Sequence, residues 1–228
     1  FTNSSNNMIY LNETSNKIYD GSITPVINNI SFSYDIYGNV VNITNFGFTD
    51  VSGDEKTEIF EYVYNTSAFI VGNPTNYSLY GSDGVTVVNQ KLYFYDNLSS
   101  GVDKGDLTKI RSINNIGGNP ETSYSYDSYG NLMREVDPLG NQTLYNYDSE
   151  TNTFLNKTIN ALGHVINYSY DKGTGNLLSE ARHGLNRSYE YDIFGRIEKE
   201  IISPDSSSLP TKNYTYNLDG SAPETIEI

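Results

Sequence analysis

The side chains best suited to acid–base or metal chemistry are two histidines, His164 and His183, the only histidines in the chain. An imidazole can act as a general base near neutral pH or bind a transition metal. Each of these histidines stands beside a glycine at an expected turn, and we interpret both as polar turn residues. The chain has no cysteine and no serine-protease or histidine-rich metal motif. We therefore expect no catalytic residue, no cofactor-binding residue and no metal ligand.

An acidic segment, Asp50-Val-Ser-Gly-Asp54-Glu55, gathers oxygen ligands close together, as a calcium loop does. Its spacing does not match the EF-hand loop, and we interpret it as an exposed acidic loop. The chain also has 21 Tyr and 9 Phe but no Trp. Tyrosine faces can stack on sugar rings, but packing between strands is the alternative that we favour.

The tyrosines belong to a repeated Tyr-x-Tyr-Asp motif. It occurs at Tyr93–Asp96, Tyr124–Asp127, Tyr145–Asp148, Tyr168–Asp171 and Tyr189–Asp192, with variants at Ser31–Asp35, Tyr62–Asn65 and Tyr214–Asn217. The second aromatic residue recurs after 30, 31 and 31 residues from Tyr34 to Tyr126, and then after 21, 23, 21 and 25 residues as far as Tyr216. The shorter step fits two strands and two turns, and the longer step leaves room for an extra excursion.

Each repeat predicts one β-hairpin. Side chains alternate along a strand, so Tyr-x-Tyr places two rings on one face. The aspartate can start a turn, and the glycine that follows supplies positive φ. The repeat aspartates could instead form an acidic ladder that attracts cations, but we favour turn capping. The predicted structural repeat residues are Tyr34, Asp35, Gly38, Tyr95, Asp96, Tyr124, Tyr126, Asp127, Gly130, Tyr145, Tyr147, Asp148, Tyr168, Tyr170, Asp171, Gly175, Tyr189, Tyr191, Asp192, Gly195, Tyr214 and Tyr216.

Successive hairpins should pair side by side, with tyrosine stacked beside tyrosine across the strands. The fold class that we predict is all-β: repeated antiparallel β-hairpins that form a curved, continuous β-sheet ribbon or shell segment. We divide the chain into a lead-in segment at 1–30, irregular long-period repeats at 31–120 and regular repeats at 121–228. These parts form one continuous structural unit. Both ends look cut, and we expect a fragment of a longer chain.

The motifs resemble the Rhs/YD-repeat family. The match is close over Tyr124-Ser-Tyr-Asp-Ser-Tyr-Gly-Asn-Leu and Asp137-Pro-Leu-Gly-Asn141. Upstream, the segments Tyr64–Pro74, Tyr80–Gly84, Tyr93–Asp96 and Lys104–Thr108 are similar to the lead-in of the B-component-like shell proteins of Tc toxins. The resemblance covers roughly residues 31 to 228.

The resemblance implies a fold in which the repeats wind as a β-sheet ribbon into a hollow shell. In that family the shell can enclose an unfolded toxic polypeptide, and some members are adhesive cell-surface proteins. Shells that release a cargo carry a self-cleaving site that depends on aspartate. The segment Asp137-Pro138-Leu139-Gly140 looks superficially like part of that site. It lies in mid-repeat, however, and we interpret it as a turn.

The net charge of the chain and its N-glycosylation sequons indicate where the protein is located and which partners it has. The formal net charge of −14 disfavours nucleic acid and anionic lipid as partners, and no apolar stretch is long enough for a membrane span. Twelve Asn-x-Ser/Thr sequons are candidates for N-glycosylation, about twice the chance expectation. They begin at Asn3, Asn12, Asn29, Asn42, Asn65, Asn76, Asn97, Asn141, Asn156, Asn167, Asn186 and Asn213. We expect an extracellular or cell-surface protein.

The function that we expect is structural: a segment of an extracellular β-sheet shell that encapsulates or presents a polypeptide. Its partners would be further repeats of the same longer chain, other copies of itself, or the enclosed polypeptide. The alternative is a cell-surface filament subunit or a module that binds carbohydrate or a neighbouring cell. Since no nucleophile, metal or cofactor signature is present, we do not expect an enzyme.

Overall fold

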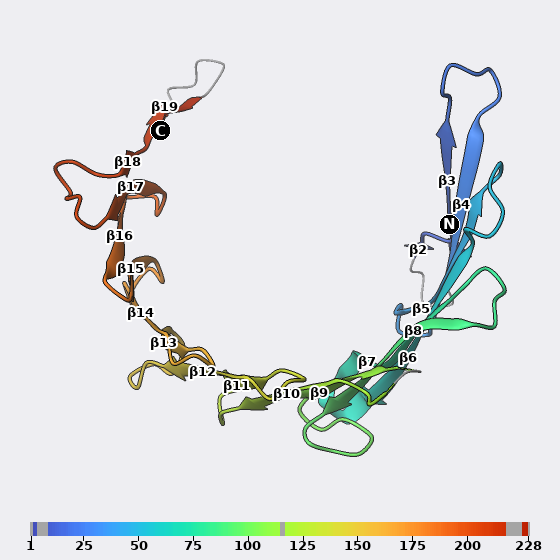
Figure 1. Ribbon diagram of the computed structural model, residues 1–228, viewed down its shortest axis with the longest axis horizontal. Helices are drawn as coiled ribbons and strands as arrows, with labels where there is room; N and C mark the ends of the chain where they lie inside the picture. The colour runs from blue at the N-terminus through green and yellow to red at the C-terminus, as the bar shows by residue number, and fades with distance from the viewer. Residues whose placement is uncertain (1, 4–8, 115–116, 218–224, 228) are drawn as a thin grey trace. The chain divides into compact units, whose positions relative to one another are not determined.

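The computed structural model describes residues 2–3, 9–114, 117–217 and 225–227, and its regular structure is almost entirely β-strand (Figure 1). Sixteen strands, β3 to β18, form one antiparallel open sheet in which the strand order is the chain order. Two short hairpins, β1 with β2 and β19 with β20, lie outside this sheet. The all-β prediction and the side-by-side pairing of consecutive hairpins are therefore confirmed. The predicted curvature stays a prediction.

The chain divides into two compact units, Phe1–Tyr124 and Ser125–Ile228, and each is described by itself. The predicted segments at 1–30, 31–120 and 121–228 stay a prediction. The first unit contains β1 (Thr2–Asn3), β2 (Ile9–Tyr10), β3 (Glu13–Ile18), β4 (Val26–Tyr34), β5 (Val40–Phe48), β6 (Lys56–Asn65), the 3-10 turn η1 (Thr66–Ala68), β7 (Ile70–Tyr80), β8 (Val87–Tyr95), β9 (Leu107–Ile113) and most of β10 (Glu121–Tyr126).

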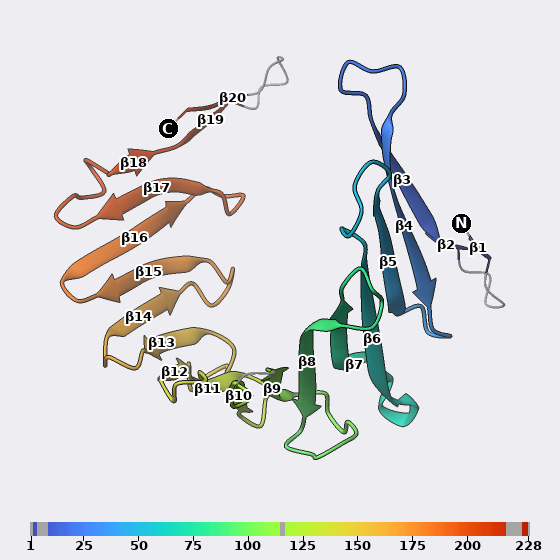
Figure 2. The same ribbon diagram turned by 45° about the vertical axis from the view of Figure 1, so that its right-hand side comes forward.

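The second unit is a ladder of short hairpins, drawn from yellow to red in Figure 2. Its strands are β11 (Leu132–Val136), β12 (Gln142–Tyr147), β13 (Leu155–Ile159), β14 (Val165–Tyr170), β15 (Leu177–Arg182), β16 (Leu185–Tyr191), β17 (Ile197–Ile202), β18 (Lys212–Asn213), β19 (Thr215–Asn217) and β20 (Thr225–Glu227). The last Tyr-x-Tyr motif departs from the pattern, because Tyr214 lies between β18 and β19 rather than within a strand of the main sheet.

Strand length explains much of the difference between the two repeat periods. The strands from β4 to β8 have 9 to 11 residues, whereas those from β12 to β17 have 5 to 7 residues. In the first two long repeats the expected extra excursion is therefore largely a lengthening of both strands of the hairpin. In the third, from Tyr95 to Tyr126, β9 and β10 have 7 and 6 residues, and the extra length lies in the segments between strands at 96–106 and 114–120.

A β-bulge recurs opposite the second tyrosine of the motif. The pairing register shifts immediately before this tyrosine, and one residue of the return strand is skipped. The resulting pairs are Tyr34 with Val40, Tyr95 with Leu107, Tyr147 with Leu155, Tyr170 with Leu177 and Tyr191 with Ile197. A bulge increases the local right-handed twist. Each of these hairpins thus adds its extra twist at the same point of the repeat.

The predicted stacking of tyrosine beside tyrosine across strands is wrong. Tyr168 lies opposite Glu180, and Tyr189 lies opposite Glu200. The return strand of each hairpin separates successive tyrosine strands by roughly 9–10 Å, beyond the reach of ring stacking. Three described ring pairs join a motif tyrosine to an aromatic residue outside the motif: Tyr10 with Tyr34, Tyr37 with Tyr64, and Phe154 with Tyr170. A fourth pair, Phe60 with Tyr77, contains no motif tyrosine.

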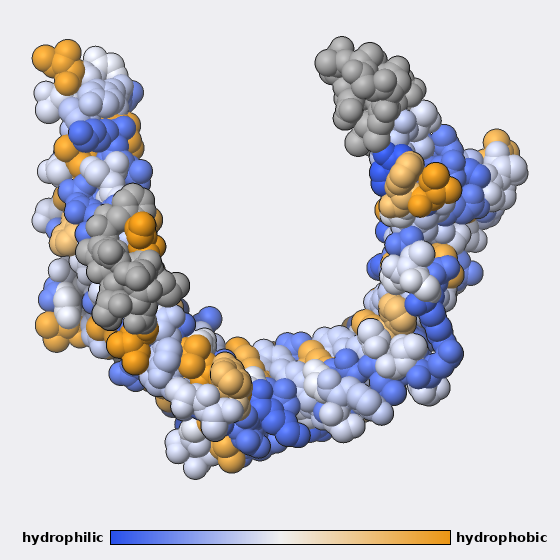
Figure 3. Space-filling view, turned by 180° about the vertical axis from the view of Figure 1, so that it is seen from behind, coloured by the Kyte–Doolittle hydropathy of each residue, from blue (hydrophilic) through white to orange (hydrophobic). Residues whose placement is uncertain are grey.

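The sheet has no thick hydrophobic core. Among the described residues, the buried hydrophobic side chains are Tyr95 and Val102, which are 5% and 8% exposed. Apolar residues are scattered in small groups among hydrophilic ones in the view of Figure 3. Most antiparallel sheets bury one face against a second layer. Here the bonds that hold the structure lie mostly within the layer. In the described part of the chain, no helix has the length and apolarity needed to cross a bilayer.

Candidate functional site

The aspartate that ends each Tyr-x-Tyr strand builds the following turn with its carboxylate. In the turn from Asp127 to Asn131, Oδ1 of Asp127 accepts hydrogen bonds from the backbone N–H of Tyr129 and Asn131 at 2.8 and 2.9 Å. Its Oδ2 accepts from Nδ2 of Asn131 at 3.0 Å. Gly130 has a φ of 86°, where any side chain would be strained.

The same geometry recurs at other turns. Oδ1 of the first residue accepts from the backbone N–H groups two and four positions on at Asp35, Asp137, Asn160 and Asp192. The glycines at the expected positions have positive φ: Gly38, Gly175 and Gly195. The segment Asp137-Pro138-Leu139-Gly140 is a turn, as predicted, with Gly140 N–H donating to the carbonyl of Asp137 at 2.9 Å.

Longer turns use the carboxylate more fully. Asp148 accepts from the backbone N–H groups of Thr151, Thr153 and Phe154 at 2.7 to 3.0 Å. These backbone bonds, led by those of Thr151 and Phe154, hold the pKa of Asp148 well below its ordinary value. Asp171 similarly accepts from Gly173 and Thr174. Each carboxylate therefore caps its own turn, which favours capping over the cation ladder considered above.

A second recurring device is a tyrosine latch, defined here as a tyrosine hydroxyl that donates to a main-chain carbonyl in or next to a strand earlier in the chain. The bonds are 2.7 to 2.9 Å long and join Tyr34 to Leu11, Tyr62 to Val40, Tyr95 to Pro74, Tyr191 to Leu177 and Tyr216 to Ile197. In β6 the latch is Tyr62, the first tyrosine of the motif. The second tyrosine, Tyr64, donates instead to Oδ2 of Asp35 at 2.8 Å. The latches tie strand to strand independently of the backbone ladder.

The motif tyrosines of β12, β14 and β16 share one face of the sheet. Following the register from β12 to β17 places Tyr145, Tyr147, Tyr168, Tyr170, Tyr189 and Tyr191 on that face. Both rings of each motif lie on one side, as the alternation predicts. The motif alone could not connect that face from one repeat to the next, whereas the pairing register of the strands does.

Charged residues on the tyrosine face form an ion-pair ladder across β15 to β18. Arg187 lies between two glutamates, with Nη1 3.4 Å from Glu180 and Nε 3.3 Å from Glu200. Arg182 also contacts Glu180 at 3.0 Å, and Lys212 contacts Glu200 at 3.2 Å. Glu200 is only 9% exposed, and a charge so well buried requires partners. This ladder was not predicted from the sequence, because the sequence alone does not show which residues of the four strands lie opposite one another.

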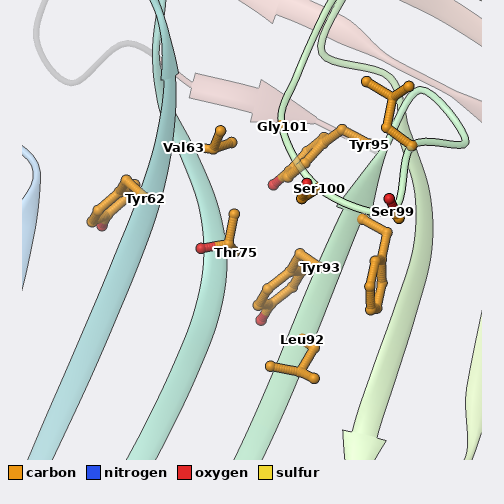
Figure 4. A pocket seen from close by; sticks show the side chains of 11 residues that line it. Tyr62, Val63, Thr75, Leu92, Tyr93, Tyr95, Ser99, Ser100 and Gly101 are labelled. Atoms are coloured by element: carbon orange, nitrogen blue, oxygen red, sulfur yellow. The ribbon is translucent and has the colours of Figure 1, made fainter.

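The first unit contains a pocket of about 380 Å³ on β6, β7 and β8, with one wall made by the loop after β8. Figure 4 shows Tyr62, Thr75 and Tyr93 projecting from three neighbouring strands on the same side of the sheet. Ser99 and Ser100 contribute hydroxyls from the loop. The pocket thus combines aromatic rings with hydroxyl groups, the combination on which the carbohydrate alternative rests.

Asp96 fixes the loop that closes this pocket. Its carboxylate accepts from the backbone N–H groups of four consecutive residues, 103 to 106, at 2.7 to 3.1 Å. Burial acts to raise the pKa of Asp96, but these four donors lower it below its ordinary value. The carbonyl of Val102 also accepts from Nδ2 of Asn65 at 3.0 Å. Burial raises the pKa of Tyr95, on the pocket wall, to about 12, so its hydroxyl stays a neutral donor at ordinary pH.

The two histidines lie at turns, as interpreted. His164 donates its backbone N–H to Oδ1 of Asn160 at 2.9 Å, and His183 has a φ of 32° beside Gly184. In the acidic loop, Asp54 and Glu55 accept from backbone N–H groups of Phe48 and Gly53 at 3.0 Å. Over the described ranges, no group of three or more His, Cys, Asp or Glu side chains is arranged to hold a metal.

The sequons fall into two classes. Most of those in the first unit are half-buried: Asn12, Asn29, Asn42, Asn65 and Asn76. Those in the second unit, together with Asn97, are exposed: Asn141, Asn156, Asn167, Asn186 and Asn213. Asn3 is in β1, but its side chain lies outside the described part of the molecule. Modification of any of them stays a prediction.

The latches and bulges were also missed from the sequence, although one signal was present. Every copy of the motif has Tyr at its second aromatic position, whereas the first position includes Phe32. A preference for Tyr over Phe indicates that the hydroxyl is used. The acceptor could not be named, because a backbone carbonyl leaves no trace in the sequence.

No protein-family model matches the chain, and no curated protein matches it. Among solved structures, TcdB2-TccC3 without its hypervariable C-terminal region is 14% identical with a TM-score of 0.35 over 85% of this chain. A Tc holotoxin pore of Photorhabdus luminescens is 12% identical with a TM-score of 0.27 over 90%.

The chain spans only 13% of the TcdB2-TccC3 chain and 15% of the holotoxin chain. A porin-like protein from Bacteroides uniformis is 13% identical with a TM-score of 0.33, covering 94% of this chain and 92% of that one. At such TM-scores these likenesses assign neither a family nor an activity to the chain.

Proposed function

We propose that the chain is a structural wall: a segment of an extracellular β-sheet shell of the YD-repeat kind, which grows one hairpin at a time and encloses or presents another polypeptide. Its partners would be further repeats of a longer chain, or other copies of itself, and the polypeptide that it encloses. We also propose that it has no catalytic activity of its own.

The observation that carries this proposal is the strictly sequential order of sixteen strands in a single layer. A chain built for a globular core folds elements over one another, so that a second layer covers the sheet. Among the described strands, each hairpin of the main sheet bonds to the one before and the one after, as in repeat proteins that extend in one dimension. The sequence motifs that resemble the YD-repeat family support the same assignment.

The main bonding devices of the repeat also suit a wall. Turn carboxylates, tyrosine latches and the ion-pair ladder join neighbouring parts of the same layer and need no second layer to pack against. Within the described part of the sheet, the terminal strands β3 and β18 each have a neighbour on one side only. An unpaired strand edge is a template for adding another strand, and we propose that neighbouring repeats bond there.

Electron cryomicroscopy of the natural gene product that contains this chain tests the proposal. The expected map shows further hairpins bonded to β3 or β18 in one continuous sheet, with a second polypeptide against one face. A map in which β3 and β18 both face solvent, and in which no second polypeptide lies against the sheet, would contradict the proposal. For the filament alternative, sedimentation velocity of the chain should show a mass that grows with concentration.

The pocket on β6 to β8 favours carbohydrate binding as a second candidate function. Leu98, 42% exposed, lines this pocket, so L98W would fill it. L139W is a matched control, because Leu139 is an 88% exposed turn residue of the other unit. Binding on a glycan array that L98W abolishes and L139W preserves supports this function. Absence of binding by the unmodified chain rejects it.

A further inference from the structure

The face opposite the tyrosines in the second unit carries a grid of small polar residues over β14, β15 and β16. One cross-strand row is Asn167, Ala181 and Asn186. The next row is Ser169, Ser179 and Ser188. The Oγ atoms of Ser169 and Ser179 lie 2.7 Å apart. No ring or long aliphatic side chain stands in either row, so the surface here is low and polar.

The first row lies in a shallow depression of about 460 Å³, whose lining includes Asn167, Ala181 and Asn186. Both asparagines are exposed. Within the described part of the chain, neither side-chain amide makes a hydrogen bond. Their Nδ2 atoms are therefore accessible, and the depression leaves space beside each of them.

Both asparagines begin sequons, Asn167-Tyr168-Ser169 and Asn186-Arg187-Ser188. Because residues i and i+2 of a strand share a face, the acceptor asparagine and the required serine lie together on this side. The middle residues, Tyr168 and Arg187, lie on the tyrosine face. The sequon serines, Ser169 and Ser188, are two of the three members of the second row.

We propose that Asn167 and Asn186 are sites of N-glycosylation, so that over β14 to β16 the glycans cover this one face and leave the tyrosine face bare. The inference rests on the extracellular route of the proposed function, but not on assembly of a shell. In the transfer, Nδ2 bonds to C1 of the first sugar of a polyprenyl-pyrophosphate-linked oligosaccharide. The bond from C1 to the phosphate oxygen breaks, the lipid pyrophosphate leaves, and the amide loses one proton to the transferase base.

Two sequons of the first unit provide the structural contrast. Nδ2 of Asn65 donates to the carbonyl of Val102 at 3.0 Å, and Oδ1 of the same residue accepts from Ser67 and Ala68. Nδ2 of Asn76 donates to Glu61 at 3.3 Å. Both asparagines are half-buried. A glycan at either position would displace these contacts, so chains modified there should be lost before secretion.

The experiment is secretion of the chain from cultured animal cells, with a well-characterised glycoprotein secreted alongside to show that transfer is working. Glycopeptides are mapped by mass spectrometry after enzymatic release of N-glycans in heavy-oxygen water. We expect glycans at Asn167 and Asn186 in most secreted chains, and at Asn65 and Asn76 in few. N167Q and N186Q should each remove one glycan.

N146Q is the matched control, because Asn146 lies on the same face opposite Lys157 but begins no sequon. It should leave the glycan number unchanged. Circular dichroism confirms that each variant keeps its strand content. Unmodified Asn167 and Asn186, or full modification of Asn65 and Asn76 in chains with unchanged thermal unfolding, would overturn the inference.

Discussion

A tyrosine at the latch position differs from phenylalanine only by its hydroxyl, and that hydroxyl ties the strand to its earlier neighbour. In β16, the hydroxyl of Tyr191 donates to the carbonyl of Leu177 at 2.7 Å. An intramolecular hydrogen bond contributes roughly 0.5–1.5 kcal/mol net to stability. In a sheet without a thick core, each such bond adds to the backbone ladder that holds its hairpin in place.

Y191F should lower the free energy of unfolding by about 0.5–1.5 kcal/mol, because it removes the latch and leaves the ring in place. Urea denaturation followed by circular dichroism measures the change. Y168F is the matched control, since Tyr168 is the first tyrosine of the preceding motif and is not a latch. If the two variants lose the same stability, the latch is not what distinguishes the two positions.

The turn aspartates predict how stability depends on pH. Backbone donors hold the pKa of Asp148 well below its ordinary value of 3.8, and donors likewise lower the pKa of Asp96 and Asp171. The unfolded chain therefore binds protons at a higher pH than the folded chain does. The stability from these carboxylates is fully present well above pH 3.8 and is lost as the pH falls through the lower folded values.

We expect the urea midpoint of unfolding to be nearly constant from pH 7 to about pH 5, and to fall steeply below about pH 4. D148N should be less stable at pH 7 and should lose less on acidification, because the titrating group is gone. D50N, in the exposed acidic loop, serves as the control. A midpoint that rises as the pH drops from 4 to 2.5 would contradict this account.

The aspartate and glycine roles could be predicted from the residues because turn chemistry is local. Asp127 needs only Tyr129, Gly130 and Asn131, all within four positions of it. The latch acceptors could not be predicted in this way. They depend on the bulge, which moves the register by one residue just where the second tyrosine stands.

At the level of the hairpin, the turn glycines carry a backbone requirement. Gly130 has a φ of 86°, and a Cβ placed there would meet nothing within 4 Å. G130A should therefore cost about 1–2 kcal/mol through backbone strain alone. G118A is the control, because Gly118 has open space around it and no positive φ. Thermal unfolding of both variants gives the comparison, and equal melting temperatures would show that the turn tolerates a side chain.

The ion-pair ladder should couple β15, β16 and β17. R187M leaves the buried Glu200 without one of its two cationic partners, so we expect it to destabilise the chain. The double variant R187M/E200M should be less destabilised than the sum of the two single variants. Urea denaturation of all four proteins measures the coupling. Strict additivity would mean that the pair contributes nothing.

The failed prediction of tyrosine stacking follows from the geometry of a hairpin. The repeat period brings equivalent residues two strands apart, because every outgoing strand is followed by a return strand. Glu180 and Glu200 stand where neighbouring tyrosines were expected. The strand alternation alone specified which side chains share a face, and the pairing partner required the register of both strands.

For the whole molecule, the sequence predicted the class and order of the strands but not the thinness of the sheet. The structure has only Tyr95 and Val102 as buried hydrophobic residues in its described part. Such a layer can fold because strands pair with their sequence neighbours, so that each new hairpin closes only a short loop. The proposed wall function follows from that architecture.

The most direct test of the account is nuclear magnetic resonance of the isotope-labelled chain, with cross-strand contacts between backbone protons. The sequential single layer predicts contacts between Tyr145 and Thr158, Thr158 and Ile166, Ile166 and Arg182, and Arg182 and Leu185. Strands separated by two or more hairpins should show none. Contacts between β12 and β17, or helical signatures at Tyr147, Tyr170 and Tyr191, would contradict the account.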